Sequence, residues 1–234
     1  QLEFAFKPMR MIEVDLPQPS GKMQHKRIWY MVYRITNRGN YLVAEPEVHD
    51  AGVAYKPKIS NELPPGAGPI RFFPHFVLKA PEQGKEYLDI DIPAAQKAII
   101  ARETRDGGTK LYSSTEISAI DLPISTPEED RSVWGYATWV DVDPRIDSFS
   151  VLVRGLTNAY KIREVPNGGN EIGAQRKLLA RTLQINFWRP SDAKGTDESA
   201  FKLGVQIDSN PENQKEILER YGVDERLDYL WIYR

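Results

Sequence analysis

The chain contains no cysteine among its 234 residues and only three histidines. The first absence excludes disulfide bonds, cysteine-ligated metals and a thiol nucleophile, so packing and hydrogen bonding must supply the stability of the fold. The second leaves few members for a metal site or a Ser-His-Asp relay. No His-Glu-x-x-His, Gly-x-Ser-x-Gly or Gly-x-x-x-x-Gly-Lys motif occurs. The sequence therefore predicts a protein without catalytic machinery of these kinds.

Excess charge and long apolar runs are also missing. The chain has 31 Lys and Arg against 33 Asp and Glu, which gives a net charge of -2. Because this balance lacks the basic field of a general nucleic-acid binder, we expect no nucleic-acid partner. No apolar run reaches the roughly 18 residues that a membrane-spanning helix needs, so we expect no membrane span.

Apolar residues instead occur in short alternating runs between clusters of Pro, Gly and Asn, a pattern typical of strands. Residues Ile28–Tyr33 are apolar on both faces, as expected of a central strand that is covered on both sides. The sequence predicts an all-β fold, an antiparallel β-sandwich. Further strands are expected at residues 2–7, 41–44, 70–78, 86–92, 133–142, 147–154, 160–165, 178–188, 199–207 and 226–233.

Two segments interrupt the strand pattern. Residues 93–103 have high helix propensity and an early proline. Residues 211–221 follow Asn210, which can cap a helix, and precede Gly222, which can end one. We expect two short connecting helices.

The length of the chain suits a single large β-sandwich unit, residues 1–234. The alternative is two packed β lobes, 1–120 and 132–234, joined by the proline- and acid-rich segment 121–131. No internal repeat is apparent, so a solenoid or propeller is not expected.

Both ends of the chain carry an apolar row at strand spacing. The rows are Leu2/Phe4/Phe6 and Leu227/Tyr229/Trp231/Tyr233. A terminal strand of this kind can complete a sheet edge in another subunit or close its own sandwich. We expect the second arrangement, because terminal strands of folded domains are usually tied into their own sheet.

Asp141, Asp143 and Asp147 form the one acidic cluster that resembles a ligand motif. Carboxylates at alternate positions of a loop can converge on calcium, which takes six to eight oxygens. Arg145 lies inside the cluster and the loop lacks the glycine and terminal glutamate of an EF-hand. A plain turn between two strands is the simpler interpretation. We therefore expect no cofactor, with calcium at these three residues as the alternative.

Several aromatic residues stand beside cations and could stack a ligand if they were exposed. The candidate binding residues are Phe72, Phe73, His75, Trp188 and Arg189. Because strand aromatics mostly pack inward, burial of these groups is the more economical interpretation. A lone histidine such as His75 more often satisfies a local hydrogen bond than binds an ion.

Residues 28–39, 151–160 and 182–190 resemble uncharacterised, exported proteins of planctomycete-type bacteria. The first of these segments, a strand that ends in Thr36-Asn37-Arg38-Gly39, is also similar to part of extracytoplasmic immunoglobulin-like domains. The resemblance implies a β-sandwich of immunoglobulin-like character and a location outside the cytoplasm. It brings no catalytic residues. The start of the chain without Met agrees either with removal of a signal peptide or with a sequence that has been trimmed.

The sequence thus predicts a non-enzymatic binding or assembly module outside the cytoplasm, periplasmic or secreted. The expected partner is another protein or a second copy of the chain, and a glycan is possible. The alternatives are a glycan-binding module with exposed aromatic residues, and a polysaccharide hydrolase. The hydrolase needs two carboxylates about 5–9 Å apart across a cleft, which a sequence alone does not pair.

Overall fold

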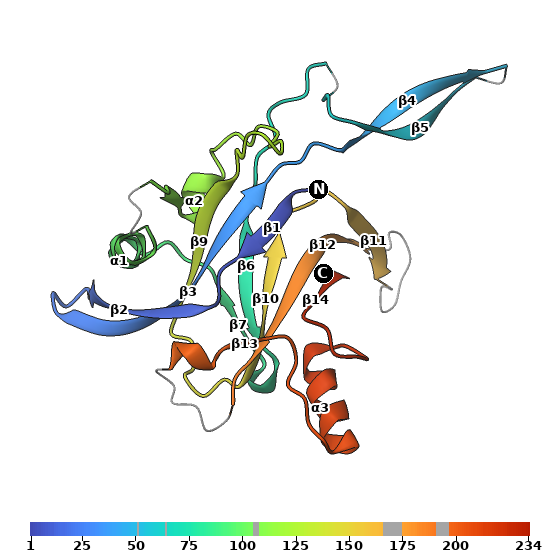
Figure 1. Ribbon diagram of the computed structural model, residues 1–234. Helices are drawn as coiled ribbons and strands as arrows, with labels where there is room; N and C mark the ends of the chain where they lie inside the picture. The colour runs from blue at the N-terminus through green and yellow to red at the C-terminus, as the bar shows by residue number, and fades with distance from the viewer. Residues whose placement is uncertain (51, 64, 105–107, 166–174, 191–196) are drawn as a thin grey trace.

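The computed structural model describes residues 1–50, 52–63, 65–104, 108–165, 175–190 and 197–234 (Figure 1). Two antiparallel sheets pack face to face, and a separate two-stranded hairpin projects from one end. The predicted all-β sandwich with short helices is confirmed. Within the described ranges, no helix is long and apolar enough to cross a membrane.

The first sheet is built around the long strand β3 (Met23–Thr36). One half of β3 pairs with β2 and the other half with β1, while β9 lies along its opposite edge. The short strand β8 joins β9 in parallel. The bounds are β1 (Glu3–Phe6), β2 (Arg10–Pro17), β8 (Leu111–Tyr112) and β9 (Val133–Val140).

The second sheet has the long strand β12 (Gln175–Trp188) as its organising element. Strands β10 and β11 share one edge of β12, whereas β13 and β14 share the other. Strands β6 and β7 extend the sheet beyond β10. The bounds are β6 (His75–Ala80), β7 (Lys85–Leu88), β10 (Ser148–Arg154), β11 (Tyr160–Val165), β13 (Lys202–Leu203) and β14 (Tyr229–Tyr233). The strand expected at 199–207 is wrong in extent, because a 3-10 turn at Glu198–Ala200 precedes β13 and Gly204 at φ +91° follows it.

The main core lies between the two sheets and is rich in aromatic rings. Trp29 and Tyr33 of β3 point into it and meet Phe149 and Phe76 of the second sheet. The intervening residue Tyr30 lies on the opposite face of β3 and is also fully buried. Strand β3 is therefore covered on both faces, as its unbroken apolar run predicts.

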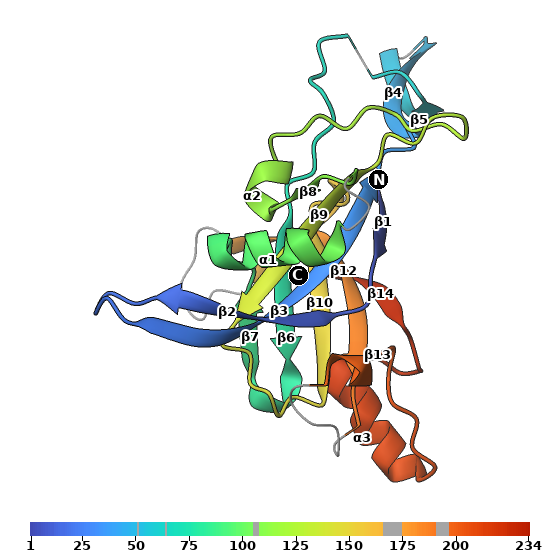
Figure 2. The same cartoon turned by 60° about the vertical axis from the view of Figure 1, so that its left-hand side comes forward.

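Both predicted helices form with the expected bounds, α1 (Pro93–Glu103) and α3 (Pro211–Tyr221). Each also covers the outer face of a sheet. Helix α1 lies across the first sheet (Figure 2) and buries Ala95 and Ile99 there. Helix α3 packs on the second sheet, where the Tyr221 hydroxyl donates to the Phe187 carbonyl at 2.7 Å. A four-residue helix, α2 (Ser114–Ile117), follows β8.

A nearly buried carboxylate fastens the end of α1 to the first sheet. Glu103 accepts hydrogen bonds from Lys7 at 3.0 Å, Arg10 at 2.7 Å and the Tyr30 hydroxyl at 2.9 Å. Burial raises its pKa, but the hydrogen bonds from Lys7 and Tyr30 outweigh that effect and hold the pKa below its usual value. The helix end is thereby held through charge as well as through packing.

The segment 121–131, considered above as a lobe boundary, runs along the end of the first sheet. The Ser125 amide donates to the Asn37 carbonyl at 2.8 Å, and the Leu122 amide donates to the Ile70 carbonyl at the same distance. Both sheets combine strands from before and after this segment, as the pairs β3 with β9 and β6 with β10 show.

The projecting hairpin consists of β4 (Tyr41–His49) and β5 (Gly52–Ser60). In both views it extends away from the sandwich (Figures 1 and 2), and among the described strands β4 and β5 pair only with each other. At its base the Asn40 amide donates to the Asn61 side chain at 3.0 Å. We call residues 41–60 the arm.

Candidate functional site

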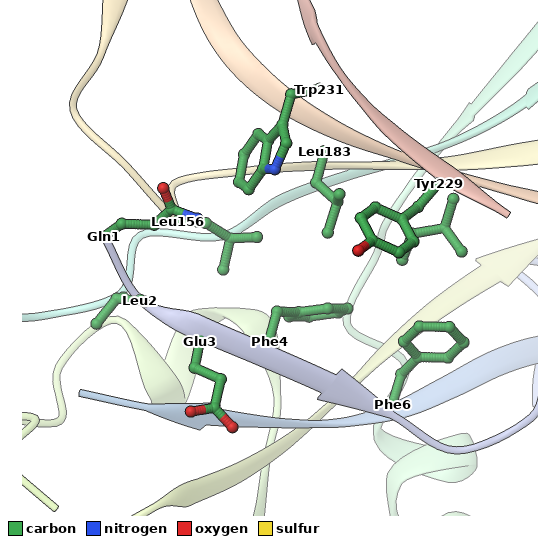
Figure 3. Close-up of a pocket in the computed structure, with 10 residues that line it drawn as sticks. Gln1, Leu2, Glu3, Phe4, Phe6, Leu156, Leu183, Tyr229 and Trp231 are labelled. Atoms are coloured by element: carbon green, nitrogen blue, oxygen red, sulfur yellow. The ribbon is translucent and has the colours of Figure 1, made fainter. Parts of the chain in front are cut away.

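An apolar groove opens at the edge of the sandwich where the first and second sheets meet (Figure 3). Its volume is about 360 Å³, within the range of ligand sites. The rings of Phe4 and Phe6 form one wall, and Leu183, Tyr229 and Trp231 form the other. The remaining lining residues are Gln1, Leu2, Glu3, Leu156 and Ile185.

Strand β1 provides the first wall and pairs with β3 in its own sheet, as expected of a terminal strand. The Lys7 amide donates to the Val32 carbonyl at 2.8 Å, which places the odd-numbered residues of β1 in hydrogen-bonded pairs with β3. The even-numbered Phe4 and Phe6 then direct their main-chain groups away from β3. Near the start of the strand, the Leu2 amide donates to the Leu156 carbonyl and closes that end of the edge.

Strand β14 provides the second wall and pairs with β12 in its own sheet. Hydrogen bonds between Ala180 and Arg234, and from the Asn186 amide to the Asp228 carbonyl, place the even-numbered residues of β14 against β12. The main-chain groups of Tyr229 and Trp231 therefore point away from β12. The same two residues place their side chains in the groove.

The groove thus combines apolar and aromatic walls with main-chain groups along both edges that have no partner among the described residues. Tyr229 is 62% exposed and Trp231 is half-buried, so a ligand can reach both rings. The Arg181 guanidinium lies 4.6 Å from the centre of the Trp231 ring and steadies it. The lining carboxylate, Glu3, is paired with Arg38 at 2.9 Å. The arrangement is suited to binding.

The five aromatic and cationic residues expected to be binding candidates lie apart from this groove. Phe72 is fully buried and Arg189 is 1% exposed, so neither presents a surface for stacking. Trp188 is partly buried at the end of β12, whereas Phe73 and His75 are exposed. A common platform for a flat ligand is therefore not formed by the set.

In the acidic loop after β9, each of the three carboxylates lies beside a cation. Asp141 pairs with Lys26 at 2.6 Å, and Asp143 pairs with Arg145 at 2.8 Å, which lowers the pKa of Asp143. Asp147 lies 3.7 Å from the buried guanidinium of Arg189. Among the described residues no group of three or more Asp, Glu or His side chains is arranged to hold a metal ion. Calcium binding at these residues stays the untested alternative to a site without a cofactor.

A second cavity of about 230 Å³ brings together a histidine, an acid and a hydroxyl, namely His75, Asp89 and Ser114. The Ser114 hydroxyl donates to the Asp89 carboxylate, and the Thr138 amide donates to the other carboxylate oxygen at 2.7 Å. Although His75 is exposed overall, partial desolvation of its ring lowers its pKa, and the nearby cation Arg154 lowers it further. A nucleophilic relay needs the hydroxyl to donate to the imidazole, whereas here it donates to the acid. The network that the hydrogen bonds form therefore consists of Ser114, Asp89 and Thr138.

A glycoside hydrolase needs two carboxylates that face each other across a cleft. Each of the five cavities found on the described part of the chain is lined by at most one carboxylate. A single carboxylate cannot divide the acid and nucleophile roles of that reaction.

The sequence predicts the apolar rows that form both walls of the groove, but it does not predict the groove itself. The rows of β1 and β14 show in the alternation of apolar residues, but their meeting depends on how the sheets pack. Comparison of the chain with protein-family models, curated proteins and solved structures finds no match.

Proposed function

We propose that the protein is a non-enzymatic binding module that takes an extended segment of a partner protein into the groove between β1 and β14. One observation carries this proposal. The residues that line the groove with aromatic rings are also the residues whose main-chain groups are free at the two strand edges. Recognition by strand addition uses both features, since main-chain hydrogen bonds give affinity and side-chain pockets give specificity.

The edge of β14 is the better template for the incoming strand. The β14 sequence Tyr-Leu-Trp-Ile-Tyr contains no proline, so its outward N–H groups are intact. The edge of β1 is shorter and is closed at one end by the Leu2 to Leu156 hydrogen bond. A strand paired with β14 would lay its apolar side chains against Phe4 and Phe6.

The location outside the cytoplasm belongs to the same proposal and is supported by the resemblance of residues 28–39, 151–160 and 182–190 to exported proteins. Fractionation of cells that produce the native protein tests it directly. Recovery in the cytoplasmic fraction would remove this part of the proposal and leave the groove argument intact.

The binding experiment uses a synthetic decapeptide of alternating Val and Thr as the probe, followed by amide hydrogen exchange. We expect the amides of Tyr229, Trp231 and Tyr233 to gain protection when the probe binds. A glycan in the groove would stack on the rings without protecting these amides. An oligosaccharide that binds while the decapeptide does not would favour the glycan-binding alternative.

Two substitutions of one residue separate main-chain from side-chain recognition. Tyr229→Pro removes an outward N–H at the first residue of β14, where proline is tolerated, and we expect it to weaken probe binding at least tenfold. Tyr229→Ala removes the same ring and keeps the N–H, so it should weaken binding less. Equal binding by the two variants would contradict strand addition at β14.

A further inference from the structure

The arm carries one apolar face and one charged face. Directly opposite residues of antiparallel strands share a face, and alternate rungs of the arm are apolar on both strands. The intervening rungs contain two ion pairs, Lys56 with Glu47 and Lys58 with Glu45, each at 2.5 Å. The apolar face, from base to tip, consists of the rungs Leu42/Ile59, Ala44/Pro57, Pro46/Tyr55 and Val48/Val53.

The apolar face is open to solvent along its whole length. A two-stranded ribbon is at best marginally stable alone in water, and contiguous exposed apolar surface usually marks an interaction site. The face therefore needs a cover. The exposed fractions are 74% for Leu42, 81% for Val48, 57% for Val53, 68% for Tyr55 and 68% for Ile59.

Prolines on both strands decide how the arm can be covered. Pro46 lies in β4 and Pro57 lies in β5, and neither can donate a main-chain hydrogen bond. Within a paired strand a proline fits where its nitrogen faces away from the partner, so each outer edge of the arm lacks a donor. Edge-to-edge extension is thereby disfavoured, and docking through the apolar face remains.

We propose that the apolar face of the arm binds the same face of a second copy of this chain, with the two arms antiparallel about a twofold axis. Such an interface is self-complementary, as a closed dimer requires. It goes beyond the proposed function, because the groove between β1 and β14 plays no part in it.

The order of the rungs supports this pairing. A twofold axis between the second and third rungs places the base rung of one arm opposite the tip rung of the other. The rung that holds the bulkiest side chain of the face, Tyr55, then lies over the rung of Ala44 and Pro57 in the partner arm, and Tyr55 itself lies over Pro57. Large residues over small ones allow two layers to interdigitate. Meanwhile the ion pairs of the charged face remain in water on the outside of the dimer.

The charge of the arm and the area of its apolar face further limit what can bind that face. The two lysines and two glutamates of the paired rungs cancel, so the arm lacks the cationic face with which amphipathic segments bind anionic lipid. Five large apolar side chains cover on the order of 500 Å² per copy, at about 100 Å² each. A pair of arms then buries about 1,000 Å², near the lower end of specific interfaces. We expect dimerisation to be reversible, with a dissociation constant in the micromolar range.

Sedimentation velocity over protein concentrations from about 1 μM to about 1 mM, spanning that range of affinity, tests the proposal. Two exposed alanines provide a matched pair, because Ala44 lies on the apolar face and Ala54 lies opposite Glu47 on the charged face. We expect a monomer–dimer equilibrium for the native chain. Ala44→Lys should raise the dissociation constant of the dimer at least tenfold. Ala54→Lys should change that constant by less than twofold.

Crosslinking gives a second readout that is independent of affinity. Because the chain has no cysteine, Ala44→Cys and Ala54→Cys each introduce a single thiol. A short bis-maleimide should join two copies of Ala44→Cys and leave Ala54→Cys uncoupled. A native chain that stays monomeric throughout, a dimer that Ala44→Lys does not weaken, or equal crosslinking of both variants would each overturn the proposal.

Discussion

Gly135 of β9 leaves the space that the ring of Tyr33 fills in the core. A Cβ at position 135 would lie 2.6 Å from both the Cζ and the hydroxyl oxygen of Tyr33, and that ring is fully buried. Since the core offers no room for the ring to withdraw, close packing here depends on glycine.

We therefore expect Gly135→Ala to lower the free energy of unfolding by about 1–3 kcal/mol, the usual cost of overpacking. Urea unfolding followed by circular dichroism measures it. Gly68→Ala is the control, because a Cβ there meets no atom within 4 Å, and its effect should stay within about 0.5 kcal/mol. Similar losses for both variants would show that the contact with Tyr33 is not the cause.

Asp89 predicts a dependence of stability on pH. Burial raises its pKa to about 6, although the hydrogen bonds from Ser114 and Thr138 oppose the shift. The folded state therefore binds this proton more tightly than the unfolded state. The contribution of Asp89 to the free energy of unfolding is highest below about pH 4, falls as the pH rises towards 6, and is then constant.

Asp89→Asn should remove this slope, because an amide does not titrate and its oxygen can still accept from Thr138. Relative to the native chain, the free energy of unfolding of the variant should rise by about 2 kcal/mol between pH 4 and pH 7. This is less than the full pKa shift of Asp89 would give, because Asp89 remains partly exposed. Chemical unfolding at several pH values measures the gain. Parallel stability curves for the two chains would contradict the assignment.

At the scale of elements, regular alternation was sufficient to predict most of the sandwich. The run Ile28–Tyr33, which is apolar on both faces of the strand, identified the central strand. A proline followed by good helix formers identified α1 and α3. Strand β5 was hidden because Pro57 made its segment resemble a loop, although a proline whose nitrogen faces outward is compatible with a hairpin.

The candidate site was less accessible to sequence reasoning. Alternation showed that Phe4 and Trp231 lie on one face of their strands, but 227 positions separate them and no local pattern reports that they face each other. The nearby charge that the fold provides for buried Arg189, Asp147, was equally inaccessible, because 42 positions separate the two residues. Non-local contacts therefore account for most of what the sequence did not predict.

The loop that follows β9 yields a prediction about metal. Because Lys26, Arg145 and Arg189 already neutralise its three carboxylates, we expect the melting temperature to be the same in EDTA and in excess calcium. A ligand that binds the folded state alone would raise the melting temperature. A rise in calcium that EDTA reverses would establish the calcium alternative at Asp141, Asp143 and Asp147.

On the scale of the whole molecule, the arm and the sandwich are expected to be energetically independent. The arm is exposed along its length, while the cores lie within and beside the two sheets. Tyr41 and Ser60 are register partners at its base, so a short linker can join them.

Replacement of residues 42–59 by a four-residue Gly-Ser linker should therefore leave a cooperative transition with a melting temperature within about 3 °C of the native value. Differential scanning calorimetry on dilute protein, where the native chain is monomeric, makes this comparison. A loss of more than about 10 °C would mean that the arm supports the sandwich.

The groove draws one wall from residues 1–6 and the aromatic part of the other wall from Tyr229 and Trp231, which the ribosome makes at very different times. Until β14 emerges, the rings of β1 face neither the aromatic side chains nor the strand edge of the second wall. Under the proposed function, a nascent chain of this protein is therefore expected to capture a partner segment only after synthesis has passed residue 231. Coupled translation with the probe peptide present would then yield bound complex in a single late step.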